Sequence, residues 1–190
     1  MTQFRRLALP EVVEITPPKF GDHRGFFSEV FKRPAFEAES IHIDWMQDNQ
    51  SFSATAGTVR GCHFQAPPFA QDKLVRVLRG AVYDVAIDIR KGSATYGKWV
   101  GCKLSAEKWN QLLVPKGFAH AFITLVPDTE VLYKVSAPYS KEHEGAIRWD
   151  DPALGIDWPD LGAVTITDKD RDAPLLANYD SPFVFEAEAR

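Results

Sequence analysis

The sequence predicts an all-β protein, a sandwich or a barrel, from three observations. Short runs rich in β-branched and aromatic residues fill the middle of the chain, with turn residues between them. Residues 81–90 alternate between two faces as a strand does, with one face made of Val82, Asp84, Ala86 and Asp88. Helical signals are few. Short strands recurring at this spacing are typical of sandwiches and barrels.

The elements follow in chain order. We expect strands at residues 57–65, 73–80, 81–90, 98–104, 111–115, 120–126 and 130–136. Short helices are predicted at residues 33–40 and within 104–112, where Ser105 would cap a turn that begins at Ala106. From about residue 146 the chain is richer in Asp and Pro. We expect this tail, about 146–190, to be irregular and to wrap back over the body.

Gly61 is expected to interrupt the first of these strands. Arg60 and His63 would point to opposite faces of an unbroken strand, because their separation is odd. A bulge at Gly61 would bring both side chains to one side, which we predict to be the interior. Lys73 and Tyr133 share faces with valines on two later strands. In a small barrel, such inward polar residues converge on a pocket in the mouth.

Composition limits the classes of protein that fit. At 190 residues and 21.3 kDa, the chain is expected to form one domain over residues 1–190. Its 22 Lys and Arg against 26 Asp and Glu give a net charge of −4, which argues against a nucleic-acid partner. No signal peptide, polybasic helix or apolar run of about 20 residues indicates a membrane partner. Two cysteines are too few for a disulfide framework, so we expect a cytoplasmic protein.

Several polar side chains are candidates for chemistry, although each also fits a structural role. His63 and His120 suit general-base catalysis near neutral pH, and equally suit partly buried structural positions. Lys73 fits a surface lysine with a buried stem, and Tyr133 fits a core residue whose hydroxyl reaches the rim. Asp170 fits a solvated turn. Taken separately, none of these residues establishes a site.

The metal-binding pattern of cupins is only half present. Residues 115–120 match its P-x-G-x-x-H half. The other half should offer H-x-H followed by a Glu, whereas here the equivalent stretch is His63-Phe64-Gln65. A metal would lack most of its ligands, since catalytic sites usually use three protein ligands. We therefore expect no metal and no other cofactor, and no phosphate loop, nucleophile elbow or Rossmann fingerprint is found.

Long runs of the sequence match one known family. They are FGDHRGFFSEVF (20–31), QDNQS (47–51), and the string RG-x-H-x-Q…PP…QDKLV…G-x-V-x-DV-x-x-D-x-R within 57–99, followed by LLVPKGFAHAF, EVLYKVSAPYSKEHEGAIRWDDPALGIDWP and TITDKDRDAP. Over about residues 4–174 the chain closely resembles the nucleotide-sugar 3,5-epimerases of the dTDP-4-dehydrorhamnose pathway, which are cupins. The resemblance implies a cupin-type jelly-roll β-barrel with a few short helices.

The resemblance also implies an activity. Such enzymes epimerise C3 and C5 of dTDP-4-dehydro-6-deoxy-D-glucose through an enolate, without a cofactor, and give dTDP-4-dehydro-β-L-rhamnose. His63 would be the base, Asp170 its orienting partner, and Tyr133 the proton donor on the opposite side. Lys73 would stabilise the charge that develops on the C4 oxygen.

The same resemblance assigns the residues that would bind the dTDP-sugar. They are Gln47, Asn49 and Arg60 at the pyrophosphate and deoxyribose, Tyr139 against the thymine, His120 near the sugar, and Glu144 and Lys169 as further contacts. Phe20, Arg24, Phe27 and Glu29 match a segment that reaches into a neighbouring subunit. The resemblance therefore implies a homodimer whose interface includes about residues 1–45, with Arg24 at the partner's diphosphate.

Other functions stay open at this point. Ala121 follows His120 where glycine is frequent in the family, and the added methyl group leaves open a single-centre epimerase (C3 or C5) of a related dTDP-4-keto-sugar. A metal-dependent cupin dioxygenase is disfavoured by the missing H-x-H. A non-catalytic sugar-binding cupin is disfavoured because His63, Asp170, Tyr133 and Lys73 occur together, and binding alone needs no base–acid pair.

Overall fold

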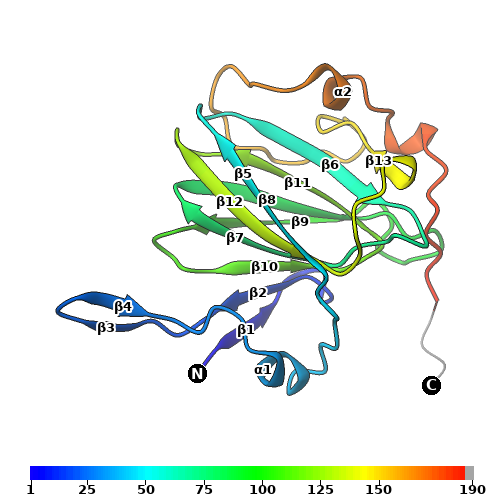
Figure 1. Cartoon of the computed structure of the whole chain (residues 1–190). Helices are drawn as coiled ribbons and strands as arrows, with labels where there is room; N and C mark the ends of the chain where they lie inside the picture. Colours follow the sequence, from blue (N-terminus) through cyan, green and yellow to red (C-terminus); the bar gives the residue numbers. More distant parts are fainter. Residues whose placement is uncertain (187–190) are drawn as a thin grey trace.

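The computed structural model describes residues 1–186, which form two antiparallel sheets packed face to face (Figure 1). The six-stranded sheet contains, in spatial order, β1 (Gln3–Arg6), β2 (Val13–Thr16), β10 (Gln111–Val114), β7 (Lys73–Arg79), β12 (Thr129–Val135) and β5 (Gln47–Ser53). The five-stranded sheet contains β13 (Glu144–Ala146), β6 (Val59–Gln65), β11 (Phe118–Thr124), β8 (Ala81–Asp88) and β9 (Trp99–Ser105). A separate hairpin pairs β3 (Phe20–Asp22) with β4 (Gly25–Phe27). The predicted all-β fold is confirmed.

All seven predicted strands are present, as β6 to β12, with ends shifted by at most two residues. The other strands were not predicted, and β5 is the most informative of them. Its sequence QDNQSFS is polar, yet it pairs along its whole length with β12. The local composition of β5 does not favour a strand. Its extended conformation therefore depends on the hydrogen bonds that it forms with β12.

The helices are short. They are α1 (Arg33–Glu37) and α2 (Asp168–Arg171), with 3₁₀ turns η1 (Lys141–His143) and η2 (Leu176–Asn178). The first confirms the helix expected at residues 33–40. No helix within residues 1–186 is both long and apolar enough to cross a membrane.

The prediction of a helix within residues 104–112 is wrong. Leu104 is fully buried in the core, and β9 runs through Ser105 into a turn. The Ser105 hydroxyl does accept a hydrogen bond from the Lys108 backbone N–H, at 3.0 Å. Trp109 then adopts a left-handed φ of 60°, which prevents a right-handed helix from continuing toward β10.

Apolar side chains cover both faces of β8, and the predicted alternation is confirmed. Val82 and Ala86 point into the core between the two sheets. Val85 and Ile87 face the opposite way, into a second apolar cluster that includes buried side chains of the tail, among them Leu154, Leu176 and Phe183. Residues 147–186 thus lie over the outer face of the five-stranded sheet, and the last four residues of the chain lie outside the described part.

A third apolar cluster lies on the outer face of the six-stranded sheet. There Phe36 of α1 packs with Val13, Ile15, Leu74 and Leu113. The barrel is therefore enclosed on one side by the tail and on the other by the segment that contains α1 (Figure 1).

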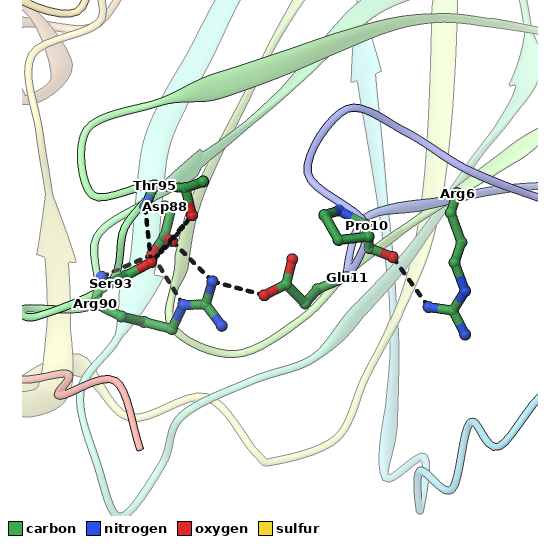
Figure 2. Close-up of polar contacts among 7 residues, drawn as sticks. All are labelled: Arg6, Pro10, Glu11, Asp88, Arg90, Ser93 and Thr95. Carbon is green, nitrogen blue, oxygen red and sulfur yellow. Dashed lines mark hydrogen bonds and ion pairs between the residues drawn. The ribbon is translucent and has the colours of Figure 1, made fainter. Parts of the chain in front are cut away.

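A buried polar cluster secures the chain beyond the end of β8 (Figure 2). Asp88 is fully buried and accepts hydrogen bonds from Arg90 Nη2 at 2.8 Å and from the hydroxyls of Ser93 and Thr95 at 2.6 Å. Arg90 also pairs with Glu11, at 2.9 Å, which ties this loop to the N-terminal segment. Burial alone would raise the pKa of Asp88, but these hydrogen bonds bring it below its usual value.

Candidate active site

A bulge in β6 aims two candidate residues into the same cavity. His63 pairs with His120 of β11, whereas Arg60 pairs with Phe122, so β6 holds one extra residue at this point. Arg60 and His63 consequently line one cavity of about 520 Å³, which confirms the prediction made from Gly61. Gly61 has a φ of +124°, and a Cβ there would lie 2.5 Å from the His120 carbonyl oxygen. Only glycine fits this position without displacing β11.

Two adjoining cavities meet at His63, Lys73 and Tyr133, which line both. The larger is also lined by the candidates Arg60, His120, Lys169 and Asp170. The smaller, of about 320 Å³, is also lined by Gln47, Asn49, Tyr139 and Glu144. The fold therefore brings these candidates together from both sheets and from α2.

Asp170 holds the ring of His63. Its Oδ1 lies 2.7 Å from His63 Nε2, and its Oδ2 accepts from the Gly61 backbone N–H at 3.4 Å. Asp170 is buried on α2, where the Thr167 side chain caps the first turn, so it is not the solvated turn residue that its sequence context suggested. Burial would raise the pKa of Asp170, but His63 and Gly61 bring it below its usual value. The carboxylate stays ionised and leaves Nδ1 of His63 available for chemistry.

Lys73 and Tyr133 extend from the neighbouring strands β7 and β12. Lys73 is buried, and its Nζ donates to the His63 carbonyl oxygen at 3.2 Å. Burial lowers the pKa of Lys73 to about 8, against the opposing charges of Asp84 and Glu144. Burial also raises the pKa of Tyr133, which keeps its phenol protonated. The cavity thus combines an imidazole, a cation and a neutral acid.

His120 belongs to a second histidine–carboxylate pair. Its Nε2 lies 2.8 Å from Oδ1 of Asp84, and both residues are buried. Sequence reasoning did not single out Asp84 as a site residue. The signal was present, because Asp84 is an acidic residue between Val82 and Ala86 on the inward face of β8.

The outer part of the site contains a second polar group. Glu144 accepts from the Tyr139 hydroxyl at 3.1 Å and pairs with Lys169 at 2.6 Å. Burial would raise the pKa of Glu144, and these two partners bring it below its usual value. On the adjoining β5, the Gln47 amide donates to Asn49 at 2.6 Å. Amide, hydroxyl and charged groups therefore line the approach to His63.

Four sequence-predicted residues lie apart from both cavities. Phe20, Arg24 and Phe27 are on the hairpin of β3 and β4, which projects away from the barrel, and Glu29 follows it (Figure 1). Phe20 is 57% exposed and Phe27 66% exposed. Arg24 pairs with Asp22, at 2.6 Å. Within a single chain these four residues do not reach the site.

Metal-ligand clusters are missing from the described part of the chain, residues 1–186. No group of three or more His, Cys, Asp or Glu side chains in this part of the chain is placed to hold a metal ion.

Both the sequence and the fold resemble known proteins. The family model described as dTDP-4-dehydrorhamnose 3,5-epimerase matches residues 6–178. A protein of that name from Sinorhizobium fredii is 52% identical over 182 residues, covering 96% of this chain and 93% of the relative. The crystal structure of the dTDP-6-deoxy-D-glucose-3,5-epimerase of Legionella pneumophila with dTDP-4-keto-L-rhamnose aligns with a TM-score of 0.94 at 40% identity, covering 98% of this chain and all of that one. The enzyme of Bacillus anthracis, with TDP and PPi bound, aligns with a TM-score of 0.89 at 46% identity, covering 92% and 99% of the two chains.

Proposed function

The chain belongs to the dTDP-4-dehydrorhamnose 3,5-epimerase family, with its cupin-type jelly-roll barrel, and we propose how its side chains perform the reaction. The enzyme epimerises C3 and C5 of dTDP-4-dehydro-6-deoxy-D-glucose to give dTDP-4-dehydro-β-L-rhamnose. The observation that supports the residue roles is the His63–Asp170 pair, at 2.7 Å, beside a cavity that Lys73 and Tyr133 also line.

His63 acts as the base at each carbon. The proton on C5 or C3 is acidic because it lies next to the C4 ketone, and His63 Nδ1 removes it while the C–H electron pair moves into the carbonyl to form an enolate. Asp170 stabilises the imidazolium that results, and it fixes the ring. The Tyr133 hydroxyl then donates a proton to the opposite face of the carbon. Exchange with solvent returns a proton to Tyr133 and removes one from His63.

Lys73 stabilises the enolate oxygen. Negative charge grows on the C4 oxygen as the proton leaves, so a fixed cation there favours the transition state over the neutral ketone. With a pKa of about 8, Lys73 is still largely charged at neutral pH. Burial helps catalysis in this position, because an ion acts more strongly in a cavity that excludes water.

The nucleotide occupies the outer part of the site. Gln47, Asn49 and Tyr139 line the smaller cavity and provide hydrogen-bonding groups and an aromatic ring for the dTDP moiety. Arg60 supplies a cation for the diphosphate from the larger cavity. Glu144 and Lys169 bound the entrance beside them. The relatives crystallised with TDP or a dTDP-sugar support a ligand of this class.

The chain works as a single-domain homodimer in this proposal. The projecting hairpin exposes Phe20, Phe26 and Phe27, which is a large apolar surface for so short an element. Seated on a second copy, the hairpin would bury these rings and carry Arg24 toward the partner's diphosphate. In this arrangement each chain completes the site of the other. The hairpin lies within residues 1–45, so this segment forms part of the interface.

Proton exchange with solvent tests the function. We expect dTDP-4-dehydro-6-deoxyglucose, incubated with the enzyme in D₂O, to gain deuterium at both C3 and C5 in NMR spectra. Deuterium at one carbon would instead indicate a single-centre epimerase, and none would contradict the proposed function. His63→Asn should abolish exchange at both positions. Exchange should survive exhaustive treatment with EDTA, because the mechanism uses side chains alone.

A further inference from the structure

Asp84 is a fully buried carboxylate beside the catalytic cavity. It lies on the inward face of β8, where its neighbours Val82 and Ala86 belong to the apolar core between the sheets. A carboxylate in such surroundings is strongly destabilising unless its oxygens are paired. Packing alone therefore does not explain an aspartate here.

The two oxygens of Asp84 have different environments. Oδ1 lies 2.8 Å from Nε2 of His120, whereas Oδ2 is buried and has no hydrogen-bond partner among the described residues. Asp170 differs in this respect, because its Oδ1 meets His63 and its Oδ2 accepts from the Gly61 backbone. The site thus contains two histidine–aspartate pairs, and Asp84 has one oxygen without a hydrogen bond.

Lys73 is a second buried charged residue, and its only printed hydrogen bond among the described residues is to the His63 carbonyl oxygen. The charges of Asp84 and Glu144 both favour the ammonium form of Lys73. Glu144 is already engaged by Lys169 at 2.6 Å and by Tyr139. The titratable and charged groups that line the two cavities with this lysine, together with Asp84 behind them, are His63, His120, Tyr133, Arg60, Tyr139, Glu144, Lys169 and Asp170.

We propose that Asp84 is a positioning residue of the epimerisation, acting through Oδ1 on the ring of His120 and through the charge of its carboxylate on Lys73. The proposal rests on the function proposed above. Because Asp84 accepts the Nε2 proton, Nδ1 of His120 is left as an acceptor for a sugar hydroxyl. Lys73 in turn remains an ammonium ion at the moment when the C4 oxygen gains charge.

Burial and the Asp84 charge act on the pKa of Lys73 in opposite directions. Burial brings the pKa of Lys73 down to about 8, and the Asp84 charge opposes that fall. Removing the charge therefore lowers the pKa of Lys73 further. If only the ammonium form supports the enolate, activity is lost as pH rises through this pKa, and the alkaline limb of the pH profile reports on Lys73.

The test is Asp84→Asn, which is nearly isosteric and removes the charge. We expect the alkaline limb of kcat/KM to move to lower pH by about one unit or more. At slightly alkaline pH, kcat/KM should fall roughly tenfold on this account. The thermal unfolding midpoint should change little, because removing a buried charge with an unpaired oxygen is offset by weaker support for the buried Lys73 ammonium. A residue with a purely structural role would change the midpoint and leave the pH limb in place.

Two further variants separate the effect of Asp84 on His120 from its effect on Lys73. His120→Gln can still donate to Asp84 through its side-chain amide but lacks the Nδ1 acceptor, so it should reduce kcat/KM without moving the alkaline limb to lower pH. Asp88→Asn is the matched control, because Asp88 is an equally buried aspartate on the same face of β8 that is bonded to Arg90. It should lower stability and leave the limb unchanged.

The outcomes are distinguishable. No deuterium exchange by the wild-type enzyme would contradict the proposed function itself. Wild-type exchange with coincident pH profiles for wild type and Asp84→Asn would overturn only the role of Asp84. If Asp84→Asn does not fold, ¹⁵N NMR of the histidines in the wild-type enzyme decides. We expect His120 protonated at Nε2 and bare at Nδ1 at neutral pH, and the opposite tautomer would overturn the proposal.

Discussion

At the scale of single residues, Gly61 determines where His63 points. The extra residue in β6 turns His63 toward the cavity that Arg60 also lines, and the Gly61 N–H donates to Asp170. This backbone approaches β11 too closely for any side chain, since a Cβ on Gly61 would lie 2.7 Å from that of Ala121. One glycine thus sets both the direction of the base and the position of its carboxylate.

Gly61→Ala should therefore impair both stability and catalysis. We expect a loss of about 3 kcal/mol in the free energy of unfolding, from the positive φ and the steric overlap together. The kcat should fall about 100-fold or more, because a small displacement of a catalytic group has a large effect. Urea unfolding and steady-state kinetics measure the two effects.

Gly92→Ala is the control for this substitution. Gly92 also has a positive φ, of 83°, but no atom lies within 4 Å of a Cβ placed there. It should lose only about 1 kcal/mol and keep its activity. Equal losses for the two variants would show that close packing at Gly61 is unimportant.

At the scale of elements, the loop after β8 joins distant parts of the chain. Arg90 pairs with Asp88 and Glu11, and its guanidinium lies over the rings of Phe118 and Phe185, at 4.6 and 5.0 Å (Figure 2 shows the polar part). One arginine therefore connects the N-terminal segment, the start of β11 and the tail. Such a residue stabilises contacts between segments that are far apart in the sequence.

Asp88→Asn should destabilise the fold by about 3 kcal/mol at neutral pH, because it leaves Arg90 partly unpaired in a buried position. The folded-state pKa of Asp88 lies below its usual value, so this stabilisation is present above about pH 4 and is lost as pH falls. Urea unfolding at several pH values should show the difference from wild type shrinking in acid.

The exposed ion pair of Lys91 with Asp180 provides the comparison. The Asp180 side chain is 89% exposed, so Asp180→Asn should change stability by no more than about 0.5 kcal/mol. A similar loss for both variants would argue that burial does not determine the strength of the Asp88 contacts.

Sequence patterns predicted the central strands because their alternation reflects burial directly. They did not predict β5, whose polar residues become a strand only through pairing with β12, nor η1, nor α2 and η2 of the tail. Bringing Asp170 to His63 joins residues 107 positions apart, which is a property of the tertiary fold. The resemblance to a family supplied that pairing, and periodicity alone did not.

At the scale of the whole molecule, one chain lacks part of the site that we propose. Arg24 lies on the projecting hairpin, away from both cavities, whereas Arg60 and Lys73 line them. A second copy could bring its own Arg24 to the diphosphate. The expected dimer is then a requirement for full activity and not only a packing arrangement.

Mixing two inactive variants tests this arrangement. Arg24→Ala and His63→Asn should each be nearly inactive alone. After subunits exchange, half of the dimers are mixed, and each mixed dimer has one intact site. Roughly a quarter of the wild-type activity should therefore return. No recovery, with exchange of labelled subunits demonstrated, would show that Arg24 does not act across the interface.

The position of β5 at the border of the six-stranded sheet has a consequence for solubility. An edge strand presents unpaired backbone N–H and C=O groups that can pair with strands of other molecules. Charged and polar side chains on edge strands often prevent this pairing. In β5, Gln47 and Asn49 line the substrate cavity, while Asp48 on the opposite face pairs with Lys134. The polar residues of β5, which kept the sequence from predicting a strand, thus line the ligand cavity and oppose aggregation. Apolar residues in their place would weaken ligand binding and lower solubility.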